Sequence, residues 1–132
     1  NIVPMIEIKD YTPEGIPKLL ELVEKYGFEK SCSIISFKRS ALELIREQNK
    51  EVRILKLVSK LDDEEMQKCL DAENMGVSFN GNEKKNTPEK IDKLREAGLE
   101  IACWTIDSPE TMLHWVSEGV TTFVTNKIYY HN

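Results

Sequence analysis

Residues 87–98 read TPEKIDKLREAG and contain the start and stop signals of one helix. Thr87 is a residue type that caps helix N-termini, Pro88 fits the first helical position, and the glutamate that follows suits the positive end of the helix. Gly98 readily takes the left-handed conformation with which many helices end. The apolar run 99–106 comes directly after it. We therefore predict a helix followed by a strand.

The same order of signals occurs three times. Ser or Thr, then Pro, then Glu begins the segments 12–27, 87–98 and 108–119, and each segment ends at Gly. Apolar runs that alternate with helices predict a parallel β-sheet covered by helices. Two arrangements fit this pattern, a doubly wound open sheet and part of a (β/α) barrel. No glycine-rich phosphate loop follows any predicted strand, which weakens the nucleotide-binding version of the open sheet.

The remaining elements continue the alternation. Further helices are predicted over residues 39–48, which carry an apolar face, and from residue 62 onward, where four acidic residues lie at the favourable helix start. We predict strands over residues 1–9, 32–37, 52–58, 75–79, 99–106 and 120–125.

The composition is that of one globular domain, and we take residues 1–132 as a single domain. A chain of 132 residues, of which 40% are hydrophobic, is able to bury a core. No apolar run reaches the roughly 20 residues of a membrane span. The net charge is −5 and the basic residues are interleaved with acidic ones, so we expect no nucleic-acid partner.

The cysteines Cys32, Cys69 and Cys103 lie far apart in mostly apolar surroundings. Their odd number and wide spacing favour buried free thiols over a disulfide framework or a zinc site. Free thiols are typical of a reducing compartment and favour the cytoplasm, although the absence of disulfides does not exclude secretion. The chain begins with Asn1 rather than Met, so we expect it to be processed or to be a piece of a longer protein.

The first predicted strand ends with two opposite charges in the stretch Ile6-Glu7-Ile8-Lys9. Because side chains alternate along a strand, Glu7 and Lys9 face the same side. Buried strands normally avoid both charges. Two interpretations stay open. The residues form a structural ion pair, or they form a site in which the carboxylate holds a metal ion and the ammonium holds an anion.

Other strands also end in polar or aromatic residues. Ser36 and Thr105 are expected to satisfy backbone groups where the strands turn into loops, with substrate contact as the alternative. Phe37 is more typical of a core than of a site. Trp104 is large enough to close a pocket mouth and to lie against a small ligand.

The two histidines show no catalytic pattern. His114 lies in the middle of a predicted helix and His131 lies next to the last residue. Neither has a metal-ligand partner nearby in the sequence, so we expect surface or packing roles. The chain therefore lacks an obvious general acid or base.

Four short motifs occur in order along essentially the whole chain. They are Ile6-Glu7-Ile8-Lys9; Ile35-Ser36-Phe37 followed by Ala41-Leu42; Gly98-Leu99 ahead of Trp104-Thr105-Ile106; and Gly119-Val120 ahead of Val124-Thr125. Each motif is common by itself, and the four together in this spacing are fairly specific. The combination resembles the glycerophosphodiester phosphodiesterase family.

The resemblance implies a (β/α) TIM-type barrel that hydrolyses glycerophosphodiesters to glycerol 3-phosphate and an alcohol with a divalent cation, usually Ca²⁺ or Mg²⁺. By this resemblance Glu7 is a metal-ligand carboxylate, and Lys9 is the catalytic lysine that faces the phosphate. Trp104 packs beside the glycerol. Ser36 and Phe37 match a further motif of the family, in which we take Phe37 as a substrate contact. Oxygen ligands and an ammonium are the groups that a cation and a phosphate require.

Two departures from the family pattern matter. Thr125-Asn126 stands where the family has a Thr-Asp pair, so Asn126 puts an amide in the place of the family's carboxylate. The family's N-terminal strands, with a His-Arg-Gly motif, further carboxylate ligands and a second catalytic His, have no counterpart in this chain. The chain then corresponds to the C-terminal half to two-thirds of the barrel. We expect a missing segment or self-association to complete this incomplete barrel, and no activity from the chain alone.

The residues leave three hypotheses open. The leading one is a metal-dependent phosphodiesterase that acts once the missing strands are present. The second is a catalytically inactive, barrel-derived binding or scaffold module, which the missing histidines and Asn126 favour. The third is an unrelated open α/β sheet, in which Glu7 and Lys9 form only a structural pair and the strand order is incompatible with a barrel.

Overall fold

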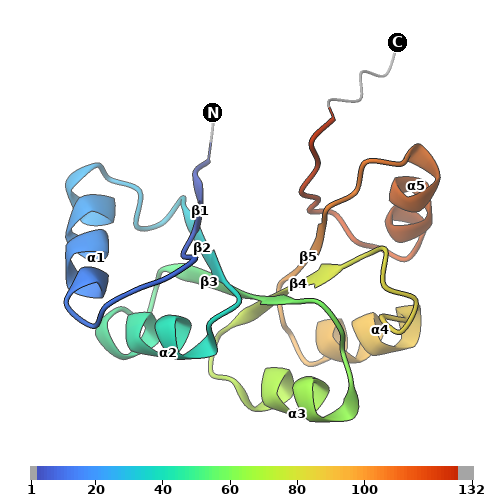
Figure 1. Cartoon of the computed structure of the whole chain (residues 1–132), viewed down its shortest axis with the longest axis horizontal. Coiled ribbons are helices and arrows are strands. Elements are labelled where there is room, and N and C mark those ends of the chain that lie inside the picture. The colour runs from blue at the N-terminus through green and yellow to red at the C-terminus, as the bar shows by residue number, and fades with distance from the viewer. Residues whose placement is uncertain (1–2, 128–132) are drawn as a thin grey trace. The chain divides into compact units, whose positions relative to one another are not determined.

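The computed structural model describes residues 3–127 as alternating strands and helices (Figure 1). The chain divides into two compact units. One consists of Asn1–Leu57 with Asn74–Gly76, and the other of Val58–Glu73 with Val77–Asn132. Within the described residues, no helix has the length and hydrophobicity needed to cross a membrane.

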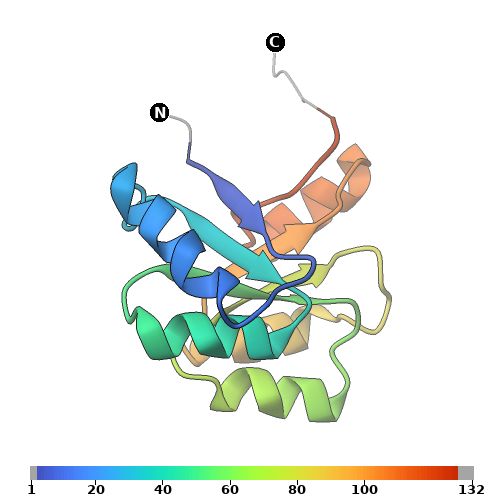
Figure 2. The same ribbon diagram turned by 60° about the vertical axis from the view of Figure 1, so that its left-hand side comes forward.

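The first unit is a parallel arrangement of strands with helices on one side. Neighbours in the chain are neighbours in the sheet, because Ser33 lies opposite both Met5 and Arg53. The two helices contact each other and lie side by side (Figure 2). The elements of this unit are β1 (Met5–Glu7), α1 (Gly15–Lys25), β2 (Ser33–Ser36), α2 (Arg39–Gln48) and most of β3 (Arg53–Val58).

The second unit repeats this pattern. Its two strands run parallel, with Val77 opposite Ile101 and Asn80 opposite Trp104. Its elements are α3 (Asp63–Asp71), most of β4 (Gly76–Asn80), α4 (Pro88–Glu96), β5 (Ile101–Trp104) and α5 (Pro109–Ser117). In both units, therefore, strands that follow each other along the chain lie parallel, as the sequence predicts.

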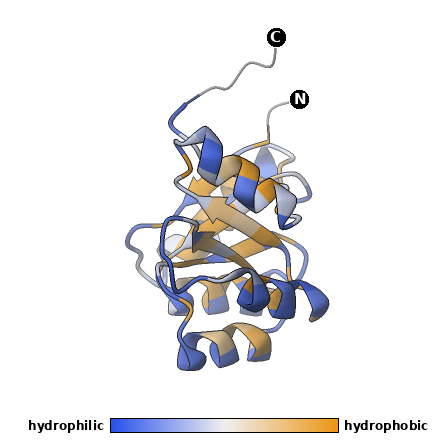
Figure 3. Ribbon diagram, turned by 90° about the vertical axis from the view of Figure 1, so that its right-hand side faces the viewer, coloured by the Kyte–Doolittle hydropathy of each residue, from blue (hydrophilic) through white to orange (hydrophobic). Residues whose placement is uncertain are grey.

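Each unit buries the apolar face of its helices. Figure 3 shows apolar residues along the strands and mixed polar and apolar residues in the helices. In the second unit, Phe79 on β4 and Trp115 on α5 meet edge to face, with ring centroids 4.7 Å apart. Leu94 on α4 and Cys103 on β5 are fully buried in the same cluster. Burial of these apolar side chains is the main force that holds helices to strands.

The predicted start and stop signals of α4 and α5 are confirmed. Helix α4 begins at Pro88 after Thr87, and α5 begins after Ser108, whose hydroxyl accepts a hydrogen bond from the N–H of Thr111. Gly98 and Gly119 follow the two helices with φ angles of +86° and +81°. Only glycine takes this conformation without steric cost, so both helices end where the sequence predicts.

Helix α1 begins later than predicted. The hydroxyl of Thr12 accepts a hydrogen bond from the N–H of Gly15, but the helix itself begins at Gly15. Pro17 explains the difference, because proline lacks an N–H and is tolerated only in the first turn of a helix. A helix that began at Pro13 would place Pro17 beyond its first turn.

The predicted sixth strand, over residues 120–125, is wrong. Its extended part is limited to a bridge in which Phe123 lies opposite Cys103. The N–H of Cys103 donates to the carbonyl of Thr122, and the N–H of Val124 donates to the carbonyl of Cys103. Pairing stops because Thr125 turns away to bond a carboxylate in the loop after β5. The other predicted strands are present and differ at their ends, the first being reduced to Met5–Glu7.

The three cysteines are free and buried, as predicted. Burial raises the pKa of the Cys103 thiol to about 12 and also raises the pKa of Cys32. A thiol with a pKa near 12 has about a thousandfold less thiolate than one near 9, and the thiolate is the reactive form. We expect the folded protein to be inert to Ellman's reagent at pH 8 and all three thiols to react in guanidinium. Rapid reaction of the folded protein would contradict this burial.

Candidate functional site

The carboxyl end of β1 places two opposite charges together. The ammonium of Lys9 lies 2.9 Å from a carboxylate oxygen of Glu7, and their side chains are 80% and 32% exposed. The expected same-side arrangement is therefore present. An exposed ion pair contributes only about 0–1 kcal/mol to stability. Glu7 and Lys9 can therefore give up their contact and bind a ligand instead at little cost in free energy. The ion pair is thus compatible with a binding site.

Ser36 ties the end of β2 to the end of β1. Its side chain is fully buried, its hydroxyl donates a 2.7 Å hydrogen bond to the carbonyl of Ile8, and its oxygen accepts a 3.0 Å bond from the N–H of Lys38. The expected role of Ser36, to satisfy backbone groups where a strand turns into a loop, is thus observed.

Phe37, the next residue, is not a core residue as its type indicated. It is 48% exposed, and the ammonium of Lys56 lies 5.8 Å from the centroid of its ring. Lys56 itself is a buried residue of β3. Phe37 thus presents an aromatic surface to solvent directly after the end of β2.

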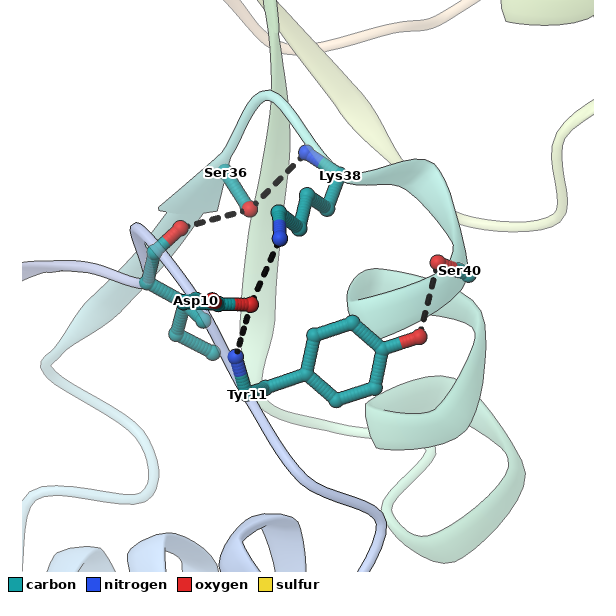
Figure 4. A network of polar contacts seen from close by, with 6 residues as sticks. Asp10, Tyr11, Ser36, Lys38 and Ser40 are labelled. Atoms are coloured by element: carbon teal, nitrogen blue, oxygen red, sulfur yellow. Dashed lines mark hydrogen bonds and ion pairs between the residues drawn. The ribbon is translucent and has the colours of Figure 1, made fainter.

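A polar network surrounds the loop after β1 (Figure 4). The carboxylate of Asp10 accepts hydrogen bonds from the ammonium of Lys38 at 2.5 Å and from the N–H of Tyr11 at 2.9 Å. The hydroxyl of Tyr11 donates to the hydroxyl of Ser40 at 2.8 Å. The hydrogen bond from Lys38, followed by that from the Tyr11 backbone, lowers the pKa of Asp10. Sequence analysis missed these residues, because Asp10 and Lys38 are 28 positions apart.

A cavity of about 440 Å³ opens beside this network. Its walls include Ile8 at the end of β1, Tyr11 in the following loop and Ile16 on α1. Ile8 is buried and its N–H still bonds to the carbonyl of Ile35 on β2. Because Ile8 alternates with Glu7, this cavity lies on the opposite side of the strand from the Glu7 carboxylate.

In the second unit, Trp104 stands at the carboxyl end of β5. It is partly exposed, and its indole N–H donates a 2.8 Å hydrogen bond to the carbonyl of Ser78 on the neighbouring strand. Cys103, the residue before it, faces the helices. Trp104 therefore lies on the other face of the sheet. The carbonyl of Thr105 accepts a hydrogen bond from the side-chain amide of Asn82.

Asn126 has a clear partner that sequence analysis did not identify. Its backbone N–H and side-chain amide donate to the two carboxylate oxygens of Asp107, at 2.8 and 3.0 Å, and the hydroxyl of Thr125 donates to the same carboxylate at 3.1 Å. The hydrogen bonds from Asn126 hold the pKa of Asp107 below its ordinary value. Asn126 therefore anchors the last described segment of the chain.

The histidines and metal ligands can be assessed over residues 3–127. His114 lies exposed on α5, with its ring 4.8 Å from that of Trp115, which agrees with a packing role. His131 lies outside the described residues. Within the described part of the chain, no three His, Cys, Asp or Glu side chains are grouped to hold a metal ion. Glu7 supplies a single carboxylate, whereas a Ca²⁺ or Mg²⁺ ion takes six or more oxygen ligands. Glu7 alone therefore does not make a metal site.

Comparison with known proteins decides the family. A sequence model of the glycerophosphoryl diester phosphodiesterase family matches residues 4–129. The chain belongs to this family. No protein of curated function matches the chain at a significant level.

Several solved structures share the fold of this chain. A structure from Galdieria sulphuraria, described as a glycerophosphodiester phosphodiesterase, has a TM-score of 0.81 and 23% identity, over 96% of this chain and 54% of its own. A glycerophosphodiester phosphodiesterase from Parabacteroides distasonis has a TM-score of 0.79 and 20% identity, over 96% and 54%. A phosphodiesterase from Oleispira antarctica, in complex with its product sn-glycerol-3-phosphate, has a TM-score of 0.73 and 15% identity, over 86% and 45%.

The likeness identifies the fold of this glycerophosphoryl diester phosphodiesterase family member as an incomplete (β/α) TIM-type barrel. The expected fold class is therefore confirmed, and the unrelated open sheet is ruled out. The chain spans about half the length of the structures that it matches.

Proposed function

We propose that this chain is the C-terminal part of an enzyme that hydrolyses glycerophosphodiesters to glycerol 3-phosphate and an alcohol. The observation that carries the proposal is the exposed Glu7–Lys9 pair at the carboxyl end of β1. In (β/α) barrels the active site lies at the carboxyl ends of the strands. Family membership supports the reaction class, and a similar structure holds sn-glycerol-3-phosphate.

Lys9 and Glu7 have complementary roles in this proposal. The ammonium of Lys9 binds the phosphate oxygens and offsets the negative charge that develops on them in the transition state. The carboxylate of Glu7 supplies one oxygen ligand to a divalent cation. When bound, such a cation polarises the phosphate. Within residues 3–127 no three His, Cys, Asp or Glu side chains are grouped, so in this proposal the missing strands supply the further carboxylate ligands.

Two aromatic residues provide apolar surface for the substrate. Trp104 is partly exposed at the carboxyl end of β5, and its large aromatic ring suits packing beside the carbon atoms of glycerol. Phe37 is half exposed and is proposed as a second contact. Asn126 is assigned a structural role, because its side-chain amide is bonded to Asp107.

Strands that are absent from this chain complete the barrel in our proposal. The chain spans about half the length of its structural relatives, and a histidine from the missing part would transfer the proton. Self-association is the alternative route to a complete barrel. A mass measurement in solution separates the two, since a dimer that hydrolyses substrate would favour self-association.

Removal of the metal tests the reaction. The full-length protein is expected to release glycerol 3-phosphate from glycerophosphocholine with Ca²⁺ or Mg²⁺ present. Chelation by EDTA should lower the rate at least about a hundredfold, the scale expected when one electrostatic stabiliser of a transition state is lost. Added Ca²⁺ or Mg²⁺ should restore it. An unchanged rate in EDTA would contradict the metal requirement.

A catalytically inactive binding or scaffold module is the second candidate. It is favoured by the lack, among the described residues, of a grouped set of metal ligands and by Asn126 at the place of the family's acidic residue. Calorimetric titration of the full-length protein with Ca²⁺ and Mg²⁺ distinguishes the candidates. No binding of either ion, together with no hydrolysis, would favour the module.

A further inference from the structure

Lys9 is bracketed by two residues, one tied to the last residue of β2 and the other to the loop after β2. On one side, the carbonyl of Ile8 accepts the 2.7 Å hydrogen bond from the hydroxyl of Ser36. On the other side, the carboxylate of Asp10 lies 2.5 Å from the ammonium of Lys38. Figure 4 shows both ties, which are made by the residues before and after Lys9 and so restrict its backbone.

The two ties are joined to each other. The buried oxygen of Ser36 also accepts a hydrogen bond from the N–H of Lys38, so the residues that make the two ties are bonded to each other. Tyr11 extends the contact to the start of α2 through its hydrogen bond to Ser40. Within this unit, the loop after β1 thus has little freedom to move away from β2.

We propose that Ser36, Asp10 and Lys38 are positioning residues, which act through Lys9 by fixing the backbone from which its side chain extends. This inference rests on the proposed function, in which Lys9 binds the phosphate. A lysine side chain is already long and flexible, so any movement of its backbone would add to the spread of positions that its ammonium takes. Small displacements of a binding group lower the rate of a reaction strongly.

Because the Lys38–Asp10 pair is exposed, a positioning role can be distinguished from a role in stability. The side chains of Lys38 and Asp10 are 43% and 83% exposed, and ion pairs at such positions contribute little to folding. Loss of the Lys38–Asp10 pair should therefore leave the unfolding temperature nearly unchanged. Its effect should appear in kcat/KM and in the binding of glycerol 3-phosphate.

The test changes Lys38 to Met in the full-length protein, which keeps the length of the side chain and removes its charge. We expect kcat/KM for glycerophosphocholine to fall about tenfold, the scale of a small misplacement of a binding group. Lys38→Arg, which retains the ion pair, should restore most of it. The matched control is Lys68→Met, because Lys68 is 2.5 Å from Glu64 with a similar exposure but lies on α3. It should leave kcat/KM unchanged.

The decisive measurement repeats Lys38→Met in a Lys9→Ala background. If Lys38 acts through Lys9, the change should have no further effect there, either on kcat/KM or on the dissociation constant of glycerol 3-phosphate measured by calorimetry. An equal loss in both backgrounds, or no loss in either, would overturn the inference and leave the proposed function intact. Full activity of Lys9→Ala itself would instead overturn the role of Lys9 in the proposed function.

Discussion

Replacing Glu7 by Gln is expected to lower kcat for glycerophosphodiester hydrolysis by about a hundredfold or more, with the fold retained. The change keeps the shape of the side chain and removes the charge that the proposal assigns to the cation. Loss of one charged stabiliser of a transition state costs on this scale. The fold should be insensitive, because the exposed Glu7–Lys9 pair contributes little to stability. Steady-state kinetics and a thermal unfolding curve measure the two quantities.

The matched control for this variant is Glu64→Gln. Glu64 also pairs with a lysine, Lys68, at an exposed position, but it lies on a helix rather than at a strand end. It should leave kcat unchanged. Retention of activity in Glu7→Gln would refute the role of Glu7 in holding the metal, whereas an equal loss in both variants would indicate a general electrostatic effect.

Replacing Gly81 by Ala is expected to lower the free energy of unfolding by about 3 kcal/mol, at the upper end of the usual cost of overpacking a core. A Cβ atom on Gly81 would lie 2.3 Å from the sulfur of Cys103, 2.7 Å from Ile106 and 2.8 Å from the indole nitrogen of Trp115. All three neighbours are buried, so they have little room to shift. The carbonyl of Gly81 also accepts a hydrogen bond from Trp115, which the shift would strain.

Gly15→Ala provides the control for this prediction. A Cβ atom there would meet only the hydroxyl of Thr12, at an ordinary 3.4 Å. Because Gly15 is the first residue of α1, alanine should be neutral or stabilise the protein by up to about 1 kcal/mol. Urea unfolding curves of both variants measure the free energies. Similar free energies of unfolding for the two variants would mean that the core around Gly81 yields more easily than its close contacts indicate.

Local signals were enough to predict most of the fold. The ends of α4 and α5 are determined by residues next to them in the sequence, namely Thr87, Ser108 and the glycines that follow the two helices. The start of α1 depends on Pro17, which lies further along the chain than the usual capping signals. The end of the last extended segment depends on Asp107, a contact across 19 positions that no local pattern contains.

The contacts of the candidate site likewise divide into a local one, which the sequence predicts, and a long-range one, which it does not. The Glu7–Lys9 contact joins residues only two positions apart, so the sequence predicts it directly, although β1 ends at Glu7 and Lys9 lies in the following loop. The Asp10–Lys38 pair depends on how two loops meet, and opposite charges are too common in this chain to identify the pair beforehand. The charge of Asp10 directly after the strand was the only available signal.

The two tryptophans of the chain differ in their surroundings. Trp115 is 2% exposed and packs against Phe79, whereas Trp104 is partly open to solvent at the end of β5. Their fluorescence should therefore separate into a blue emission from the core and a redder emission from the strand end. An ionic quencher such as iodide should reduce the second far more than the first. The chain thus carries its own optical label at the place where the glycerol is proposed to bind.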